Sequence, residues 1–301
     1  MVIKAQKSAR RTREDVVVDI VNYCLLVLVG IVMLYPFYYT VICSFSDGID
    51  LMKGGVYLLP RVWSLASYRL VLSDSAWQSA FFISVARTAI GTVLCTLMTT
   101  VFAYGLSRRE LVFRRGYTMM VIITMYFSGG LIPYYVLLRN LGLLNSFLVY
   151  IIPGMVNTFF TLTGVNFMRA IPEPVLEAAR IDGASEFRIF RTIVLPTSLP
   201  FLATLALFSA VGHWNSWLDS AYYVRDPKLQ TLAFKTMTTL NQTLASSADS
   251  ATAGQISQAN SATNFTIQAT AMVISMAPIL CVYPFLQKYF VQGMMLGAVK
   301  E

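Results

Sequence analysis

The stretch Glu177–Pro196 reads EAARIDGASEFRIFRTIVLP, and it is a compact charged segment between two long apolar runs without charges. Pro172 and Pro174 precede its first residues, and proline suits the first helical turn because its missing N–H would have no partner there. We therefore predict a helix from about Glu173 to Ile181. Gly183 is placed to end that helix in a left-handed conformation.

A second short helix is predicted directly after this turn. Ser185 can cap it, Phe187 and Ile189 lie within it, and Pro196 marks the approach to the next apolar run. Two short helices joined by a glycine turn make a rigid element attached directly to the apolar runs on both sides. Displacing the element would therefore displace both runs.

Composition places the chain among membrane proteins. Of its 301 residues 56% are hydrophobic and only 13% are charged, and the mean hydropathy is +0.61, which no ordinary soluble domain of this length shows. Crossing a hydrocarbon core of about 30 Å takes about 20 apolar residues as helix. The predicted fold is an all-α membrane protein with six transmembrane helices. The spans lie near Val16–Cys43, Phe81–Leu106, Tyr117–Leu138, Ser146–Met168, Ser198–Leu218 and Phe265–Phe290, with a tail of residues 1–15 before a single transmembrane domain of residues 16–301.

The distribution of Lys and Arg predicts the orientation of the spans. With the N-terminus inside, the inner segments hold roughly twice as many of these residues as the outer loops, as the positive-inside rule requires. Both termini are then cytoplasmic, and residues 169–196 form a cytoplasmic loop. The net charge of +8 serves orientation and is no argument for nucleic acid binding.

In this orientation the charged loop is available to a soluble partner. Ala178 and Ala179 keep one side of the first helix thin, so that a partner backbone can approach closely. Glu177, Arg180 and Asp182 offer polar contacts around that face. We predict a docking surface there.

The loop also resembles a known family. Glu177-Ala178-Ala179, three residues, Gly183, nine residues and Ile193-x-Leu195-Pro196 resemble the EAA loop of membrane subunits of ATP-binding-cassette (ABC) importers. The flanking sequence IPEPVLEAARIDGAS is similar to the maltose-type carbohydrate permeases, and in detail to the lipoprotein-type subgroup for complex oligosaccharides. The basic loop Arg108–Arg115, the WNSW sequence at Trp214–Trp217 and the ending Gly293–Lys300 extend the resemblance over essentially the whole chain.

The resemblance implies a type I ABC importer permease fold in the bacterial cytoplasmic (inner) membrane. It implies a second permease subunit, with a heterodimer favoured, two copies of an ABC ATPase and an extracytoplasmic sugar-binding protein. Alternating access would move a sugar or oligosaccharide, acidic ones included, across the bilayer. The ATPase-coupling residues implied are Glu177, Ala178, Ala179, Arg180, Asp182 and Gly183.

ATP chemistry is assigned to the partner. No Gly-Lys dipeptide occurs in the chain, so the phosphate-binding loop G-x-x-x-x-G-K-[ST] is absent. We therefore expect a transport subunit that is not an enzyme, with no catalytic residue, cofactor site or metal site of its own. ATP and Mg²⁺ belong to the partner ATPase.

Several polar and aromatic residues within or beside the spans are candidates for the substrate path, and each has a second interpretation. Arg87 could attract an acidic sugar or extend to the outer interface. Asn157 and Thr161 could hydrogen-bond sugar hydroxyls or a neighbouring helix. The glycines of the third span permit close helix packing or an unwound polar path, and the tryptophans could stack on sugars or form an interfacial belt. The candidates are Arg87, Tyr126, Gly130, Asn157, Thr161, Trp214, Asn215 and Trp217.

Two other functions remain open at this point. The same importer class could carry peptides or other small solutes, because the loop motif does not specify cargo. An ion-coupled secondary transporter would usually show internal repeats and carboxylates within the membrane. The one carboxylate within the predicted spans is that of Asp19, near the inner edge of the first span. This scarcity argues against proton coupling.

Overall fold

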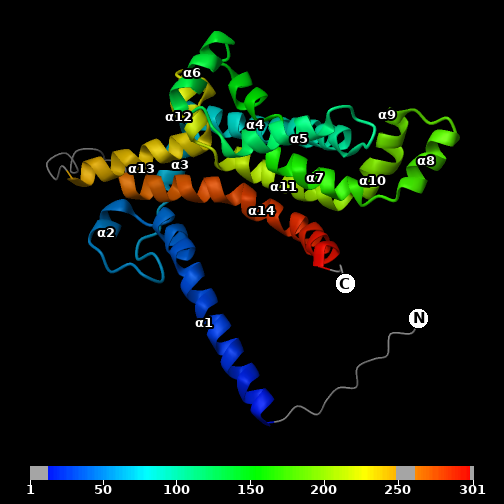
Figure 1. The fold of residues 1–301 in the computed structure, drawn as a ribbon. Helices are drawn as coiled ribbons and strands as arrows, with labels where there is room; N and C mark the ends of the chain where they lie inside the picture. The colour runs from blue at the N-terminus through cyan, green and yellow to red at the C-terminus, as the bar shows by residue number, and fades with distance from the viewer. Residues whose placement is uncertain (1–12, 249–261, 299–301) are drawn as a thin grey trace. The chain divides into compact units, whose positions relative to one another are not determined.

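The computed structural model describes residues 13–248 and 262–298, so most of the N-terminal tail lies outside the described part (Figure 1). Apart from an isolated bridge between Ser46 and Trp63, no β-structure occurs among these described residues. The α-helices are α1 (Arg13–Ser44), α2 (Gly48–Met52), α3 (Ala66–Ser73), α4 (Ser75–Ser107), α5 (Arg114–Tyr126), α6 (Leu131–Asn140), α7 (Thr158–Arg169), α8 (Glu173–Ile181), α9 (Glu186–Ile189), α10 (Leu195–Thr197), α11 (Leu199–Asn215), α12 (Leu218–Tyr223), α13 (Leu232–Ala248) and α14 (Asn264–Ala298). The 3₁₀-helices are η1 (Phe147–Tyr150), η2 (Ile152–Gly154) and η4 (Pro227–Leu229), and η3 (Phe190–Val194) is a π-helix.

Three single helices and three bent helix pairs correspond by length and composition to the six predicted spans. Asp15–Ser44, Ser75–Ser107 and Asn264–Cys281 are each long and apolar enough to cross a membrane. The other three are helix pairs bent at a short break, by 117° between α5 and α6, 41° between η1–η2 and α7, and 80° between α9–α10 and α11. Hydropathy reports how long an apolar segment is and not whether it is straight, so the bends of the fourth and fifth spans were absent from the prediction, whereas a break in the third was one of two interpretations of its glycines.

The described residues divide into two compact units, one of residues 13–68 and 262–273 and one of residues 69–248 and 274–298. In the first unit α1 is apolar and its side chains are largely exposed, as expected of a helix that faces lipid or another subunit. A small core of buried residues, including Ile42, Leu51 and Ala269, ties the end of α1 to the start of α14. The prediction of one domain over residues 16–301 stays a prediction.

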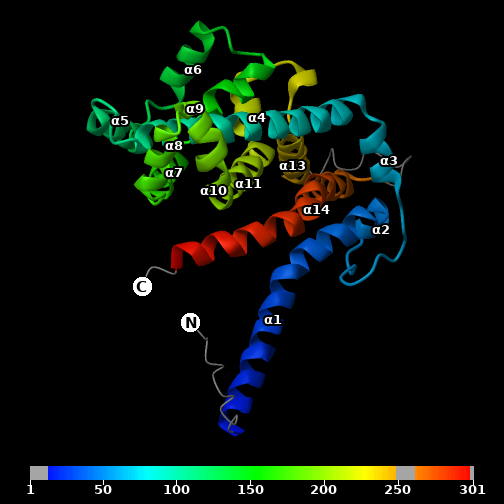
Figure 2. The ribbon, with the colours of Figure 1, turned by 90° about the vertical axis from the view of Figure 1, so that its right-hand side faces the viewer.

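In the second unit, α4 is the central helix, and α7 and α11 lie along it (Figures 1 and 2). Gly164 of α7 makes the approach of these helices close. A Cβ atom at Gly164 would lie 2.8 Å from Cβ of Ala103 in α4 and 2.7 Å from Cζ of Phe201 in α11. Position 164 therefore has room for the hydrogen of glycine and for no larger side chain.

We predict that Gly164→Ala destabilises the protein. Forcing a methyl group into this packed site displaces neighbouring side chains, at a cost of about 1–3 kcal/mol. Thermal unfolding of the purified protein measures the effect. Gly116→Ala in α5 is the matched control, because a Cβ there meets nothing within 4 Å. Equal unfolding temperatures for the two variants would contradict the prediction.

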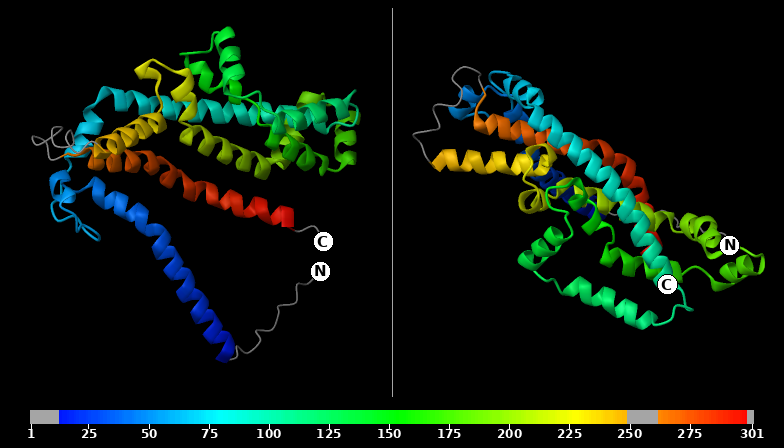
Figure 3. Two further views of the ribbon diagram at one scale, coloured as in Figure 1. Left: turned by 60° about the vertical axis from the view of Figure 1, so that its left-hand side comes forward. Right: turned by 90° about the horizontal axis from the view of Figure 1, so that it is seen from above.

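The third predicted span is broken in the middle. Residues between Tyr126 and Leu131 leave the helix, and Gly130 takes a positive φ of 83°. Figure 3 shows the resulting elbow between α5 and α6. The glycines of this span had two interpretations, and the unwound segment is the one present. A Cβ at Gly130 would meet nothing within 4 Å, so Gly130 does not serve close helix packing within the chain.

The segment leading into α11 carries a different irregularity. The π-helix η3 follows α9 directly, and Pro196, which has no N–H to donate, lies just beyond it. Pro200 stands in the first turn of α11. Proline and π-turns are recognised causes of helix bending, and they account for the 80° turn between the α9–α10 segment and α11.

Candidate functional site

The charged loop folds as its sequence predicts. Helix α8 has the predicted limits Glu173 and Ile181, and Gly183 has φ +77°. The N–H of Gly183 donates to the carbonyl of Arg180, and the N–H of Ala184 to that of Ala179, both at 3.0 Å. This pair of bonds is the Schellman motif, in which the residue after the cap adopts the left-handed conformation.

A serine cap starts the second helix of the loop. The Oγ of Ser185 accepts from the N–H of Arg188 at 3.4 Å at the start of α9. The loop is therefore a helix, a glycine turn and a helix, joined without a flexible linker to α7 and to η3.

The two faces of α8 have different surroundings. Leu176 is 1% exposed and belongs to a core of α4, α7, α9, η3 and α11 residues, against which Ala179 also packs. Ala178 and Ile181 face outward, and the exposed fraction of Ile181 is 85%. The two alanines that the sequence interpretation grouped on one contact face thus divide, with Ala178 outside and Ala179 toward the core. Glu177, Asp182 and Gly183 are exposed as well.

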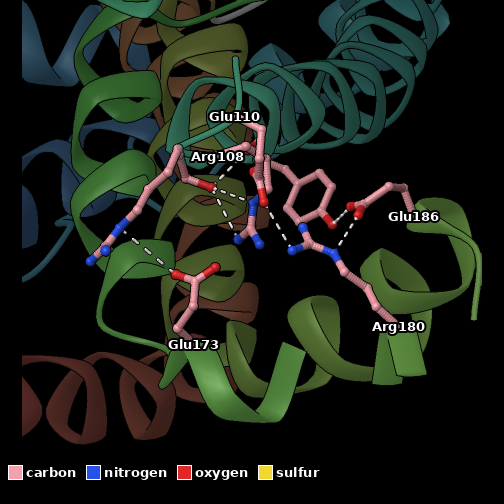
Figure 4. Close-up of polar contacts among 8 residues, drawn as sticks. Arg108, Glu110, Glu173, Arg180 and Glu186 are labelled. Carbon is pink, nitrogen blue, oxygen red and sulfur yellow. Dashed lines mark hydrogen bonds and ion pairs between the residues drawn. The ribbon is translucent and has the colours of Figure 1, made fainter. Parts of the chain in front are cut away.

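Arg180 lies on the inner side, where it joins three segments (Figure 4). Its Nη1 lies 2.9 Å from Oε1 of Glu110 in the α4–α5 loop, and its Nε donates to Oε1 of Glu186 in α9 at 2.9 Å. The hydroxyl of Tyr104, in the last turn of α4, donates to the other oxygen of Glu186 at 2.6 Å. The guanidinium of Arg108 covers the Tyr104 ring at 4.5 Å from its centroid. We call Tyr104, Arg108, Glu110, Arg180 and Glu186 the loop clamp.

The loop clamp holds α8, α9 and the α4–α5 loop together. Only Arg180 was selected from the sequence, because Glu110 and Glu186 are separated from it by 70 and 6 residues and carry no motif of their own. A hydrogen bond from its own backbone N–H and the charge of Arg180 lower the pKa of Glu110. The pair is thus formed at neutral pH and is lost only as the pH falls through this lowered pKa.

We predict that Arg180→Lys loosens the clamp. Lysine keeps the charge but cannot bridge two carboxylates with a planar fork. Because the side chains of Arg180, Glu110 and Glu186 are 30%, 60% and 54% exposed, the loss should be about 1 kcal/mol, or about fivefold in local opening. Hydrogen exchange of amides 108–113 measures this opening. Arg188→Lys, an exposed residue of α9 outside the clamp, is the control; equal exchange in the two variants would contradict the assignment.

A polar cavity lies between α4, α11 and α12. Its volume is about 340 Å³, and Arg87, Tyr134, Tyr150, Asn157, His213 and Asp219 are among its lining residues. In the part of the chain that the structure describes, no group of His, Cys, Asp or Glu that could hold a metal ion occurs here or elsewhere.

Arg87 has the partner expected of a cation in a span. It is 3% exposed, its Nη1 donates to the carbonyl of Ser216 at 2.9 Å and its Nη2 pairs with the Asp219 carboxylate. The guanidinium lies 4.6 Å from the centroid of the Tyr150 ring, and the hydroxyl of Ser216 also donates to Asp219, at 2.9 Å. Arg87 is therefore anchored inside the unit and does not extend to an interface. Tyr150 was not selected from the sequence, which shows it only as one aromatic residue among many.

The other candidate residues do not gather at this cavity, apart from Asn157. Thr161 donates to the carbonyl of Asn157 one turn earlier in the chain, at 2.8 Å, and lines a second, apolar hollow. Trp214 is buried, and its Nε1 donates to the carbonyl of Ser275 in α14 at 2.9 Å, so it fixes a helix contact. Tyr126 and Asn215 are exposed at helix ends, Gly130 precedes α6, and Trp217 precedes α12.

Comparisons with known proteins agree with this architecture. The family of binding-protein-dependent transport system inner membrane components matches residues 97–296, which include the charged loop. The polygalacturonan/rhamnogalacturonan transport system permease protein YtcP of Bacillus subtilis (strain 168) is 35% identical over 285 residues, covering 94% of this chain and 98% of that protein. Protein LplC of the same organism is 35% identical over 289 residues, covering 96% and 97%.

A solved structure shares the fold. It is a chain from the crystal structure of a bacterial ABC transporter involved in the import of the acidic polysaccharide alginate. That chain has a TM-score of 0.82 and 29% sequence identity, with 94% of this chain and all of the other covered. The family predicted from the charged loop is confirmed. This chain belongs to the binding-protein-dependent transport system inner membrane components, and it is a permease subunit of an ABC importer in the inner membrane.

Proposed function

We propose that this permease carries an acidic oligosaccharide into the cell as one half of a heterodimeric membrane pair, driven by two copies of an ABC ATPase and supplied by an extracytoplasmic sugar-binding protein. The observation that carries the coupling role is the division of α8 into a fixed inner face and an exposed outer face. The inner face joins α4, α7 and α11, which include three of the predicted spans. A push on the outer face is therefore transmitted to those spans.

The outer face suits docking in a cleft of the ATPase. It presents Ala178 and Ile181, with the side chain of Ile181 85% exposed, and the charges of Glu177 and Asp182 at its edge. Apolar groups at the centre of a contact with polar groups around them are the usual anatomy of a protein interface. Of the residues proposed for coupling, Ala179 and Arg180 act from the inner side, by holding the helix in place.

Crosslinking tests this assignment on the assembled importer. A cysteine at Ala178 should crosslink to the ATPase, whereas a cysteine at Ala179, one residue along the same helix, should crosslink weakly or not at all. Asp182, exposed beside the turn, should behave like Ala178. Crosslinks to the ATPase from neither Ala178 nor Asp182 would reject the coupling role.

The proposal of an acidic sugar has two supports. The relatives named above include a polygalacturonan/rhamnogalacturonan permease and a protein of alginate import, and their cargoes carry carboxylates. The cavity offers the Arg87 guanidinium together with Tyr134, Tyr150 and Asn157. Because Asp219 already neutralises Arg87, a sugar carboxylate would have to compete with Asp219 for this cation. Recognition would then depend on aromatic stacking and hydroxyl hydrogen bonds as well as on charge.

ATP hydrolysis by the reconstituted importer with its binding protein distinguishes the cargoes. Short galacturonate oligosaccharides should stimulate hydrolysis, and neutral oligosaccharides of equal length should stimulate it less. Stimulation by peptides and by no sugar would favour the same importer class with another cargo. A lack of stimulation by every sugar would reject the carbohydrate assignment.

A further inference from the structure

A basic pocket lies at the ends of α4 and α7, apart from the cavity that holds Arg87. Its volume is about 340 Å³, and four arginines line it together with one carboxylate, that of Glu173. The arginines are Arg108, Arg109, Arg114 and Arg169. The pocket therefore carries a net positive charge and suits an anion.

Much of this charge is uncompensated. Arg109 lies 3.9 Å from Glu173, and Arg108 covers the ring of Tyr104. Among the described residues, neither Arg114 nor Arg169 makes an ion pair. Arg114 and Arg169 line the same pocket of about 340 Å³. Arginines kept close without an acidic partner are typical of sites that bind phosphate or carboxylate groups.

An apolar groove lies beside the basic pocket along the same helices. Its volume is about 530 Å³, and it runs between α4, α5 and α7. Leu106 lines the groove and is followed in the chain by Ser107 and Arg108 of the pocket, while Tyr117 of the groove stands one helical turn after Arg114. From Tyr117 to Thr124 the groove follows α5 for about 10 Å.

The walls of the groove are accessible. Phe102 is 52% exposed and Met120 is 65% exposed. A cationic pocket beside an apolar groove has the polarity of a phospholipid, whose charged headgroup is joined to acyl chains. A free phosphate would occupy the pocket but leave the groove uncovered.

We propose that this composite site binds an anionic phospholipid. Its phosphate is held by Arg114 and Arg169, and an acyl chain lies in the groove along Gly105. The ligand would be held between the base of α8 and the spans α4, α5 and α7, where it would influence how firmly the loop is seated. Basic pockets between transmembrane helices are known to accept such headgroups.

The headgroup is tested with the intact importer in nanodiscs of equal parts phosphatidylcholine and phosphatidylglycerol. After extraction into mild detergent, native mass spectrometry measures the phosphatidylglycerol retained per complex. The double variant Arg114→Gln/Arg169→Gln should bind it about 30-fold more weakly, as expected for losing two cations near an anionic lipid. The control Arg115→Gln/Arg139→Gln removes the same charge from outside the pocket and should retain the lipid. Equal loss in the two double variants would overturn the proposal.

The groove is tested by Gly105→Leu. Gly105 lines the groove and a Cβ there meets nothing within 4 Å, so the leucine side chain starts in free space and should occupy part of the groove. Gly116→Leu, equally free of contacts but outside the groove, is the control. Only Gly105→Leu should lower phosphatidylglycerol retention.

Two other occupants give different results. In the first case, inorganic phosphate alone stabilises the wild-type importer against heat but does not stabilise the Arg114→Gln/Arg169→Gln variant, and Gly105→Leu retains the lipid. The site then binds a soluble anion, and the lipid proposal is wrong. If Gly105→Leu separates the two permease subunits, the groove is a subunit interface, which also overturns it. Neither outcome depends on which sugar the importer carries.

Discussion

Gly183→Val is expected to abolish import while the protein still inserts into the membrane and assembles. Gly183 has φ +77°, and a Cβ at this position would meet nothing within 4 Å. The cost of valine therefore comes from the backbone and not from a clash with neighbours. The left-handed conformation costs an L-residue about 1–2 kcal/mol, and it is rarer still for β-branched residues. Valine would force the turn to open and would break the bonds from Gly183 to Arg180 and from Ala184 to Ala179.

Opening this turn uncouples α8 from α9. The spans themselves are untouched, so the amount of protein in the membrane should stay near that of the wild type. Substrate uptake by proteoliposomes, with ATP hydrolysis recorded in parallel, measures the loss. Gly183→Asn is the matched control, because asparagine tolerates the left-handed region. It should keep most of the uptake, and a valine variant that imports as well as the asparagine variant would contradict the role of the turn.

Asp219→Asn is expected to give the largest loss of stability. The Arg87 guanidinium is 3% exposed and would remain buried after its counter-charge is removed. Breaking a buried pair from one side costs about 3–5 kcal/mol. Because the Asp219 side chain is 34% exposed, we expect about 3 kcal/mol, at the lower end of that range. Thermal unfolding of the purified complex and the amount of protein in the membrane both report it.

A double-mutant cycle separates the ion pair from other effects. Arg87→Gln/Asp219→Asn removes both charges, so it should be more stable than Asp219→Asn alone. Ser216→Ala removes only the 2.9 Å hydrogen bond from Ser216 to Asp219 and should cost about 1 kcal/mol. If the double variant is as unstable as Asp219→Asn, the unpaired cation is not the cause of the loss.

The pairing also changes how the cavity is interpreted. From the sequence, Arg87 was a cation within a span that could attract an acidic sugar or extend to the interface. Asp219 lies 132 residues away and follows the break after α11. The pair can thus form only because α4 lies along α11. Gly91 of α4 permits this close contact, because a Cβ there would lie 2.6 Å from Nε2 of His213 in α11.

The sequence alone determined the local structure of the charged loop. The limits of α8, the left-handed Gly183 and the Ser185 cap all depend on interactions among residues a few positions apart. Proline, glycine and serine restrict or satisfy the backbone in the same way wherever they occur. The apolar segments were also predictable, because an apolar stretch of about 20 residues must avoid water.

Only the tertiary structure decided which of these residues face one another. Ala178 and Ala179 are neighbours in the chain, yet only Ala179 packs against the core of α4 and α7 residues, because it lies three residues after the buried Leu176 and so on the same side of α8. Arg180 finds Glu110, and Arg87 finds Asp219, across 70 and 132 residues. Such pairs follow from how the helices pack against each other, and a linear pattern of hydrophobicity and turns carries no information about that packing.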